Sequence, residues 1–142
     1  MELAWMLLAN HAEAPNGLLY ISGGTWDTVN VNGPPPENAP EGVVAALVGT
    51  LVVRLEFHHT ELGHDYPFRI TIVDEDGSTV GAIDGDISAD PQADTPSTWM
   101  HGSNLIIGLT GLPLPRFGEY RINIQVNRDH KGDIPFRVVR RY

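Results

Sequence analysis

The chain has 142 residues, with 18 acidic and nine basic side chains and a net charge of −9 at pH 7. This length fits one domain with a sizeable core, because a chain of about 150 residues buries roughly two thirds of its unfolded surface. The negative charge opposes attraction to polyanions and argues against nucleic-acid and anionic-membrane partners. Cysteine is absent, which excludes disulfides and thiolate metal sites and is compatible with the cytoplasm, where we expect the protein to reside.

The N-terminal segment 3–9, LAWMLLA, is apolar on both faces of an extended chain. It is much shorter than the roughly 20 residues of a membrane span, and Glu2 stands where a signal peptide would be positive. We interpret it as a strand buried on two sides, with a short helix as the rival. Pro15-Asn16-Gly17 predicts a turn into a second strand at 18–21, and 25–31 is a third strand or its continuation.

The middle of the chain contains a loop and a long apolar run. Residues 33–42 include four prolines, which indicates a surface loop within a single domain spanning 1–142. Residues 43–57 are long enough for a helix, but the valines and Gly49 disfavour one. We expect a long strand with a bend or bulge at Gly49.

The segment 67–88 predicts a β-hairpin. Asp76-Gly77 suits a two-residue type I′ turn, and that turn places Ile70 opposite Ile83 and Arg69 opposite Asp84.

Three further strands are expected at 99–109, 120–126 and 134–140, the second with unbroken apolar and polar alternation. Pro135 cannot donate to a ladder and therefore indicates an edge position. Eight or nine strands without a helix predict an all-β, single-domain antiparallel β-sandwich.

The motifs LAWMLLANHAEAPNGLLYISGG, DEDG and LPRFGEYRINIQVN, with the closing IPFRV, resemble a family of small bacterial proteins known only as a domain of unknown function. The last third is also similar to immunoglobulin-like and fibronectin-like sandwiches, in which a Pro-x-Gly-x-Tyr turn leads into a late strand. Pro115, Gly118 and Tyr120 form such a pattern with one extra residue. The resemblance implies a sandwich and transfers no catalytic residue.

Potential metal ligands are densest in one short segment, at His58, His59, Glu61 and His64. Imidazoles with a carboxylate suit a transition metal, but neighbouring strand residues point to opposite faces. We expect a solvated loop, with a metal-dependent enzyme as the alternative.

Other candidate chemistry is sparse. The acidic tip at 74–76 and the later Asp84 and Asp86 lie too far apart along the predicted hairpin to share a calcium ion. No serine lies in a G-x-S-x-G elbow and no phosphate loop is present, so we expect neither catalytic residues nor a cofactor.

Aromatic and basic residues suggest contact surfaces. Trp5 and Trp26 read as core residues, whereas Trp99, Met100 and His101 follow a polar loop and are candidates for an interface. Arg137 and Arg140 give the C-terminal strand a basic end, which is expected to meet an acidic patch such as 74–76 on another copy or another protein.

The function that these observations favour is a non-catalytic β-sandwich that acts through protein–protein contacts as an accessory or assembly subunit. Self-association, most simply a homodimer, is the expected form. The alternatives are a small-molecule or carbohydrate-binding module that uses Trp99, Trp26 and loop acids, and the metal-dependent enzyme. Sandwiches host all three classes, so the fold does not choose among them.

Overall fold

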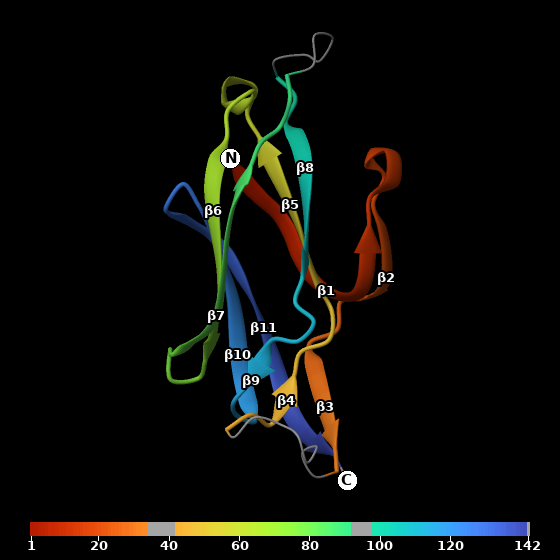
Figure 1. The fold of residues 1–142 in the computed structure, drawn as a ribbon. Helices are drawn as coiled ribbons and strands as arrows, with labels where there is room; N and C mark the ends of the chain where they lie inside the picture. The colour runs from red at the N-terminus through yellow and green to blue at the C-terminus, as the bar shows by residue number, and fades with distance from the viewer. Residues whose placement is uncertain (34–41, 92–97, 142) are drawn as a thin grey trace.

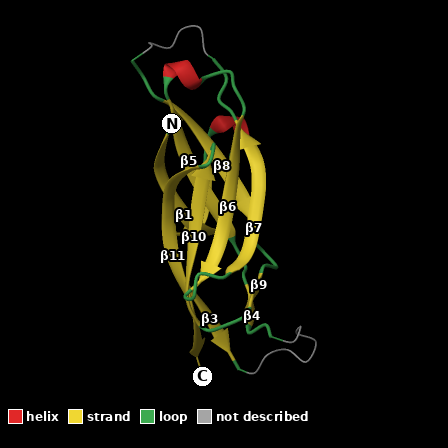
Figure 2. Cartoon of the chain, turned by 90° about the vertical axis from the view of Figure 1, so that its left-hand side faces the viewer, coloured by secondary structure: helices red, strands yellow, loops and turns green. Residues whose placement is uncertain are grey.

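The computed structural model describes residues 1–33, 42–91 and 98–141. The predicted proline-rich loop at 33–42 therefore lies almost wholly outside the described residues. Two β-sheets face each other in two layers, as Figures 1 and 2 show, and the described part of the chain contains no α-helix. The prediction of an all-β sandwich is confirmed.

The strand order defines the two layers. The four-stranded sheet has the order β2 (Tyr20–Gly24), β1 (Glu2–Glu13), β5 (Thr50–Phe57), β8 (His101–Gly108). The five-stranded sheet has the order β3 (Thr28–Asn32), β11 (Asp129–Arg141), β10 (Gly118–Val126), β6 (Tyr66–Asp74), β7 (Thr79–Ile87). Four short elements complete the described fold. β4 (Ala45–Ala46) pairs with β9 (Pro113–Leu114), and η1 (Pro15–Gly17) and η2 (His59–Glu61) are 3₁₀ turns.

The core lies between the two sheets and is built from alternate residues of each strand. Tyr120, Ile122 and Ile124 of β10 are buried, while Glu119 and Arg121 are exposed. The four-stranded sheet contributes Leu51, Val53, Leu55 and Phe57 from β5, all completely buried. The alternation predicted for 120–126 is thereby confirmed.

The β6–β7 hairpin has the predicted register but not the predicted turn. Ile70 lies opposite Ile83, and Arg69 lies opposite Asp84 at 2.8 Å between Nη1 and Oδ2. The loop has three residues between Asp74 and Ser78, with Gly77 at φ 81° as its left-handed residue. A bulge between the Ile72 and Val73 pairings takes up the extra loop residue, which restores the register further along.

The run 43–57 is two strands rather than one long bent strand. β4 pairs with β9, whereas β5 belongs to the four-stranded sheet, and Gly49 lies in the break between them. An added Cβ at Gly49 would lie 2.6 Å from Trp26 Cζ2 and 2.9 Å from the Ala9 carbonyl oxygen. The chain therefore passes between Trp26 and β1 at a point where only glycine fits.

The last strand corrects the expectation of a purely antiparallel sandwich with a C-terminal edge. From Arg137 to Arg141, β11 pairs in parallel with β3, so its C-terminal half lies inside the sheet. Pro135 lies before this pairing and opposite Arg121 of β10, with no second strand paired to it among the described residues. The edge interpretation thus holds for Pro135 itself and fails for the end of the strand.

The turn before β10 contains a tyrosine corner. The Tyr120 hydroxyl donates to the Arg116 carbonyl oxygen at 2.7 Å and accepts the Arg116 backbone N–H at 3.0 Å. Its ring stacks on Phe136, with centroids 5.1 Å apart. This corner is a hallmark of immunoglobulin-like sandwiches, and it lies at the turn that the Pro115, Gly118 and Tyr120 pattern predicted.

Candidate functional site

The outer face of the four-stranded sheet is apolar, unlike the outer face of an ordinary one-sided sheet. Leu7, Val52 and Ile106 lie side by side on β1, β5 and β8, on the face turned away from the core. They belong to a second hydrophobic cluster that also contains Trp5, Ala9, Ala12 and Leu19. The prediction that the first strand is apolar on both faces is confirmed, and its second face needs cover.

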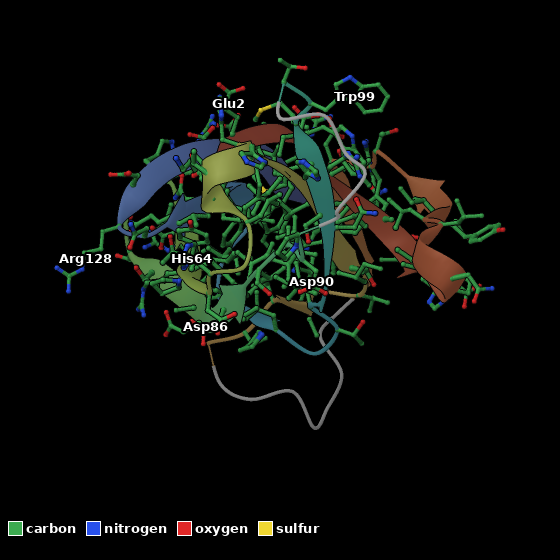
Figure 3. All side chains as sticks on the ribbon, turned by 90° about the horizontal axis from the view of Figure 1, so that it is seen from above. Glu2, His64, Asp86, Asp90, Trp99 and Arg128 are labelled. Carbon is green, nitrogen blue, oxygen red and sulfur yellow. The ribbon has the colours of Figure 1, made fainter. Side chains whose placement is uncertain are left out.

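The β1–β2 hairpin supplies part of that cover. Ala9 pairs with Thr50 of β5 on one side and with Gly24 of β2 on the other, and beyond it β1 continues only with β2. The hairpin stands to the right of the sheet in Figure 1 and projects from the body in the view from above in Figure 3. Ala12 and Leu19 anchor it, since both pack in the second cluster.

The hairpin also exposes apolar side chains of its own. Leu18 is 63% exposed, Tyr20 54% and Ile21 37%, and these are three of the six exposed large apolar residues in the described part of the chain. We call these three residues the hairpin surface. No charged residue occurs from Ala14 to Gly24, although 27 of the 142 residues are acidic or basic. A compact apolar surface without charge is typical of protein contact sites.

The turn that joins the two arms is well defined. Asn16 at φ 56° and Gly17 at φ 77° both have left-handed backbones, and the Leu18 N–H donates to the Pro15 carbonyl oxygen at 3.1 Å. Asparagine and glycine are the residues that adopt this conformation at least cost. The predicted Pro15-Asn16-Gly17 turn is confirmed, and it presents Leu18 at the start of the returning arm.

A pocket lies where the hairpin leaves the sandwich. A hollow of about 590 Å³ is lined by nine residues without a charged side chain: Asn10, Gly23, Gly24, Trp26, Thr28, Val29, Asn30, Ala46 and Val48. Trp26 is wedged against Gly49 and its indole N–H is buried without a hydrogen-bond partner in the described structure. The pocket therefore combines a fixed aromatic ring with amide and hydroxyl groups.

Residues 4–139 match a family described as "Family of unknown function (DUF6941)". The chain belongs to this family. A search of curated proteins found no match. Among solved structures, the chain is similar over 66% of its length to a glycosyl hydrolase family 2 member from Bacteroides cellulosilyticus, with 13% identity and a TM-score of 0.35. The matched region is only 13% of that enzyme's chain, and the likeness carries no argument about this family's function.

The predicted metal ligands are placed around the η2 turn without converging. Glu61 Oε1 lies 2.6 Å from the Met1 ammonium and accepts the His58 backbone N–H at 2.8 Å. Burial opposes ionisation of Glu61, but these two hydrogen bonds outweigh it and lower the pKa of the carboxyl group. Among the described residues, no three histidine or acidic side chains gather as a metal site would require.

The interface candidates lie at opposite ends of the molecule. Trp99, 65% exposed, precedes β8 at the upper end in Figure 1, whereas Arg137 and Arg140 lie near the C-terminus at the lower end. Met100 is half-buried, and His101 begins β8 with a buried Nε2 that has no hydrogen-bond partner among the described residues. These residues do not form one surface.

The basic end already has partners within the chain. Arg137 Nε donates to Thr28 Oγ1 at 3.2 Å, and the guanidinium of Arg140 lies 5.1 Å from the centroid of the Phe117 ring. At the same end, Arg116 pairs with the acidic tip of the β6–β7 hairpin. Asp74, only 8% exposed, pairs with Arg116 at 3.0 Å, and Asp76 pairs with the same guanidinium.

The Asp74 carboxylate also organises the hairpin turn. Its Oδ1 accepts the backbone N–H groups of Asp76 and Ser78 at 3.0 and 2.9 Å. The hydrogen bond that Arg116 donates to Asp76 and the charges of both carboxylates raise the pKa of Arg116. Asp84 and Asp86 remain on β7 opposite Arg69 and Pro67, away from this tip, as the predicted register requires. The tip acts as a structural ion-pair network.

Sequence reasoning missed the hairpin surface as a site. It identified 18–21 as a strand but gave Leu18, Tyr20 and Ile21 no role, because apolar strand residues are usually core residues. The available signal was the absence of charge from Ala14 to Gly24, directly after a first strand that is apolar on both faces. One strand cannot bury both faces in a single core, so an additional contact was implied.

In the described residues, no helix has the length and apolar character needed to cross a membrane.

Proposed function

We propose that this protein is a non-catalytic β-sandwich that acts through protein–protein contacts, with the hairpin surface as its contact site. The observation that supports the proposal is the exposure of Leu18, Tyr20 and Ile21 together on an uncharged arm. Interface centres are rich in aromatic and aliphatic groups and poor in charge, and the rest of this chain is strongly acidic. The arm is therefore the part of the described surface best suited to a partner.

The geometry favours a rigid rather than an adaptable contact. Leu19 and Ala12 hold the hairpin against the outer face of the sheet, and the Asn16-Gly17 turn fixes its tip. A preorganised surface loses little conformational entropy when a partner binds. An accessory or assembly subunit needs such a surface more than it needs a catalytic pocket.

Photocrosslinking in the native cells tests this function. The photoreactive residue p-benzoylphenylalanine is placed at Tyr20 and, as a matched control, at Asp84, whose side chain is 63% exposed on β7. We expect a discrete protein adduct from position 20 alone, weakened by Leu18→Ser without loss of folding. No adduct at position 20, or equal adducts at both positions, would contradict the proposal.

Binding of a small neutral ligand is the second candidate function, and the pocket beside Trp26 is the observation that favours it. A wall without charge does not select ions, whereas an aromatic ring with the Asn10 and Asn30 amides and the Thr28 hydroxyl suits a neutral sugar or polyol. One polar group of the pocket wall already has a partner within the chain, since Asn30 Oδ1 accepts a hydrogen bond from Arg141 Nε at 3.0 Å. Asn10 is therefore the polar group to test first.

An NMR titration with cellobiose, a neutral disaccharide, tests this second candidate. We expect millimolar cellobiose to shift the side-chain amide resonances of Asn10 and the backbone resonance of Gly23, and Asn10→Ala to abolish the shifts. The Trp99 indole resonance is the internal control, because Trp99 lies outside the pocket. Absence of any shift at Asn10 would exclude the sugar-binding candidate.

A further inference from the structure

We propose that two copies of this chain form a twofold dimer in which their β2 strands pair antiparallel, edge to edge. This inference rests on the proposed function, because it names a second copy as the partner of the hairpin surface. It also moves the expected dimer contact away from the C-terminal arginines and the acidic tip, whose charges are already partnered within the chain. The argument has a backbone part, an electrostatic part and a side-chain part.

The backbone part starts from β2 as the terminal strand of its sheet. Among the described residues β2 pairs only with β1, through Gly24, Ser22, Ile21 and Tyr20. Asn10 and Gly23 do not pair in this ladder, and Gly23 has a left-handed backbone at φ 60°, so the alternation of inward and outward groups is interrupted there. From Tyr20 to Ser22 the pairing with β1 is continuous, and the N–H and C=O groups of alternate residues point away from β1.

These outward groups are self-complementary. If a twofold axis passes beside Ile21, Tyr20 of one copy lies opposite Ser22 of the other, and the outward groups of the two strands exchange backbone hydrogen bonds. The two Ile21 residues then face each other across the axis as a cross-strand pair. The pairing joins two four-stranded sheets into one continuous sheet.

The electrostatic part shows that this edge is open to a second acidic copy. Each copy carries a net charge of −9, so approach is least unfavourable where charge is absent, and residues 14–24 have none. Natural proteins protect exposed edges with charges, prolines or bulges. The β7 edge has Asp84, Asp86 and a bulge, whereas β2 has only Tyr-Ile-Ser-Gly-Gly and all five of its residues are exposed.

The side-chain part sets the expected strength. Pairing would cover the exposed Tyr20 and Ile21 and bring Leu18 beside the Gly24 end of the other strand. One strand pair with three apolar side chains per copy buries less than the roughly 1,200–2,000 Å² of a tight complex. We therefore expect a dissociation constant in the micromolar range.

Analytical ultracentrifugation of the full chain, from micromolar to millimolar concentration, tests the dimer. We expect a reversible monomer–dimer equilibrium that strengthens as salt is raised, because salt screens the repulsion between two acidic copies. A contact between the arginine end and an acidic patch would instead weaken with salt. A monomer at every concentration, or a dimer that salt dissociates, would overturn the proposal.

Edge variants locate the contact. Ser22→Pro removes a backbone N–H and makes the edge unfit for strand pairing, and Ser22→Lys adds a charge to the edge. We expect both to be monomeric, and Ser22→Lys serves if the proline variant disturbs the hairpin. Thr79→Lys, an exposed position on the β7 edge, is the matched control and keeps the wild-type equilibrium. Dimers that persist in both Ser22 variants would overturn the β2 contact.

The two proposals fail in different ways. If position 20 crosslinks to a different protein while the purified chain stays monomeric, the β2 dimer is overturned and the contact function stands. If position 20 gives no adduct in cells, the contact function itself is contradicted, whatever the purified chain does at high concentration.

Discussion

Tyr120 and Gly49 are the two positions where a single small group decides the local structure. The Tyr120 hydroxyl is the only part of a 2% exposed side chain that needs a polar partner, and the Arg116 backbone provides both a donor and an acceptor. Gly49 has the opposite property, because its lack of a side chain lets Trp26 and Ala9 approach. Tyr120 joins the preceding turn to Phe136 of β11, and Gly49 lies against Trp26 and β1, which are distant from it in sequence.

Tyr120→Phe is expected to destabilise the protein by about 1–3 kcal/mol, because it leaves part-buried backbone groups of Arg116 without their partner. Urea unfolding followed by fluorescence measures the change. Tyr20→Phe, at a 54% exposed position, is the control and should change stability by less than about 0.5 kcal/mol. Equal effects of the two substitutions would contradict a structural role for the corner.

The same residue predicts a pH dependence. Burial raises the pKa of Tyr120 in the folded protein, whereas a tyrosine in an unfolded chain ionises near pH 10. The stability contributed by the neutral phenol is thus fully present below about pH 10 and is lost as the pH rises through the folded pKa. We expect the stability advantage of wild type over Tyr120→Phe to shrink above about pH 10, as measured by urea unfolding at several pH values.

Gly49→Ala is expected to destabilise the protein by about 1–3 kcal/mol, since the new methyl group would overlap Trp26 and the Ala9 carbonyl. Thermal unfolding provides the measurement. Gly108→Ala is the matched control, because nothing lies within 4 Å of an added Cβ there. A neutral Gly49→Ala would show that the Trp26 contact is not tight.

At the scale of elements, β10 shows how one strand divides its residues between core and solvent. Tyr120 and Ile122 are buried in the core, and Arg121 between them pairs with Asp133 on the exposed face. β1 departs from this division, because Leu8 faces the core while Leu7 faces the second cluster. The difference between one-sided and two-sided burial separates an ordinary strand from one that carries the hairpin.

Ile122→Ala and Ile124→Ala are each expected to cost about 2–5 kcal/mol, the range for truncation of a fully buried aliphatic side chain. Arg121→Ala removes an exposed ion pair and should cost less than about 1 kcal/mol. Urea melts of the three variants compare them directly. Losses of similar size at Arg121 and Ile122 would contradict the faces seen in the structure.

At the scale of the whole molecule, two apolar clusters lie on opposite faces of the four-stranded sheet. The main core joins the two sheets, whereas the smaller cluster attaches the β1–β2 hairpin to the outside of one of them. The hairpin therefore depends on the sandwich, but the sandwich does not depend on the hairpin to the same extent. Local opening of the hairpin is the expected low-energy motion.

Leu19→Ala is expected to loosen the hairpin without unfolding the sandwich, because Leu19 packs only in the second cluster. Hydrogen exchange measured by NMR should show faster exchange at the β2 amides that bond toward β1, and unchanged protection at Ile122 and Ile124 in β10. Uniform loss of protection across both sheets would show that the two clusters unfold as one unit.

Local patterns in the sequence were sufficient for most strands and for some of their pairings. Alternation from 68 to 73 and from 120 to 126 determined which side chains face the core, because side-chain direction in a strand repeats every two residues. The register of Ile70 with Ile83 and the turn into Tyr120 followed from nearby residues in the same way. Family membership agrees with the resemblance of these motifs.

Tertiary structure alone decided which strands are neighbours and what lies on the outer face. Alternation identifies a buried face but not the strand that covers it, so the parallel pairing of β3 with β11 had no local signal. Gly49 indicated a bend, but not that the segments on its two sides pair in different sheets. The hairpin surface was hidden for the same reason. Leu19 and Leu18 look alike in sequence, and only the packing of Leu19 into the second cluster leaves Leu18, Tyr20 and Ile21 exposed.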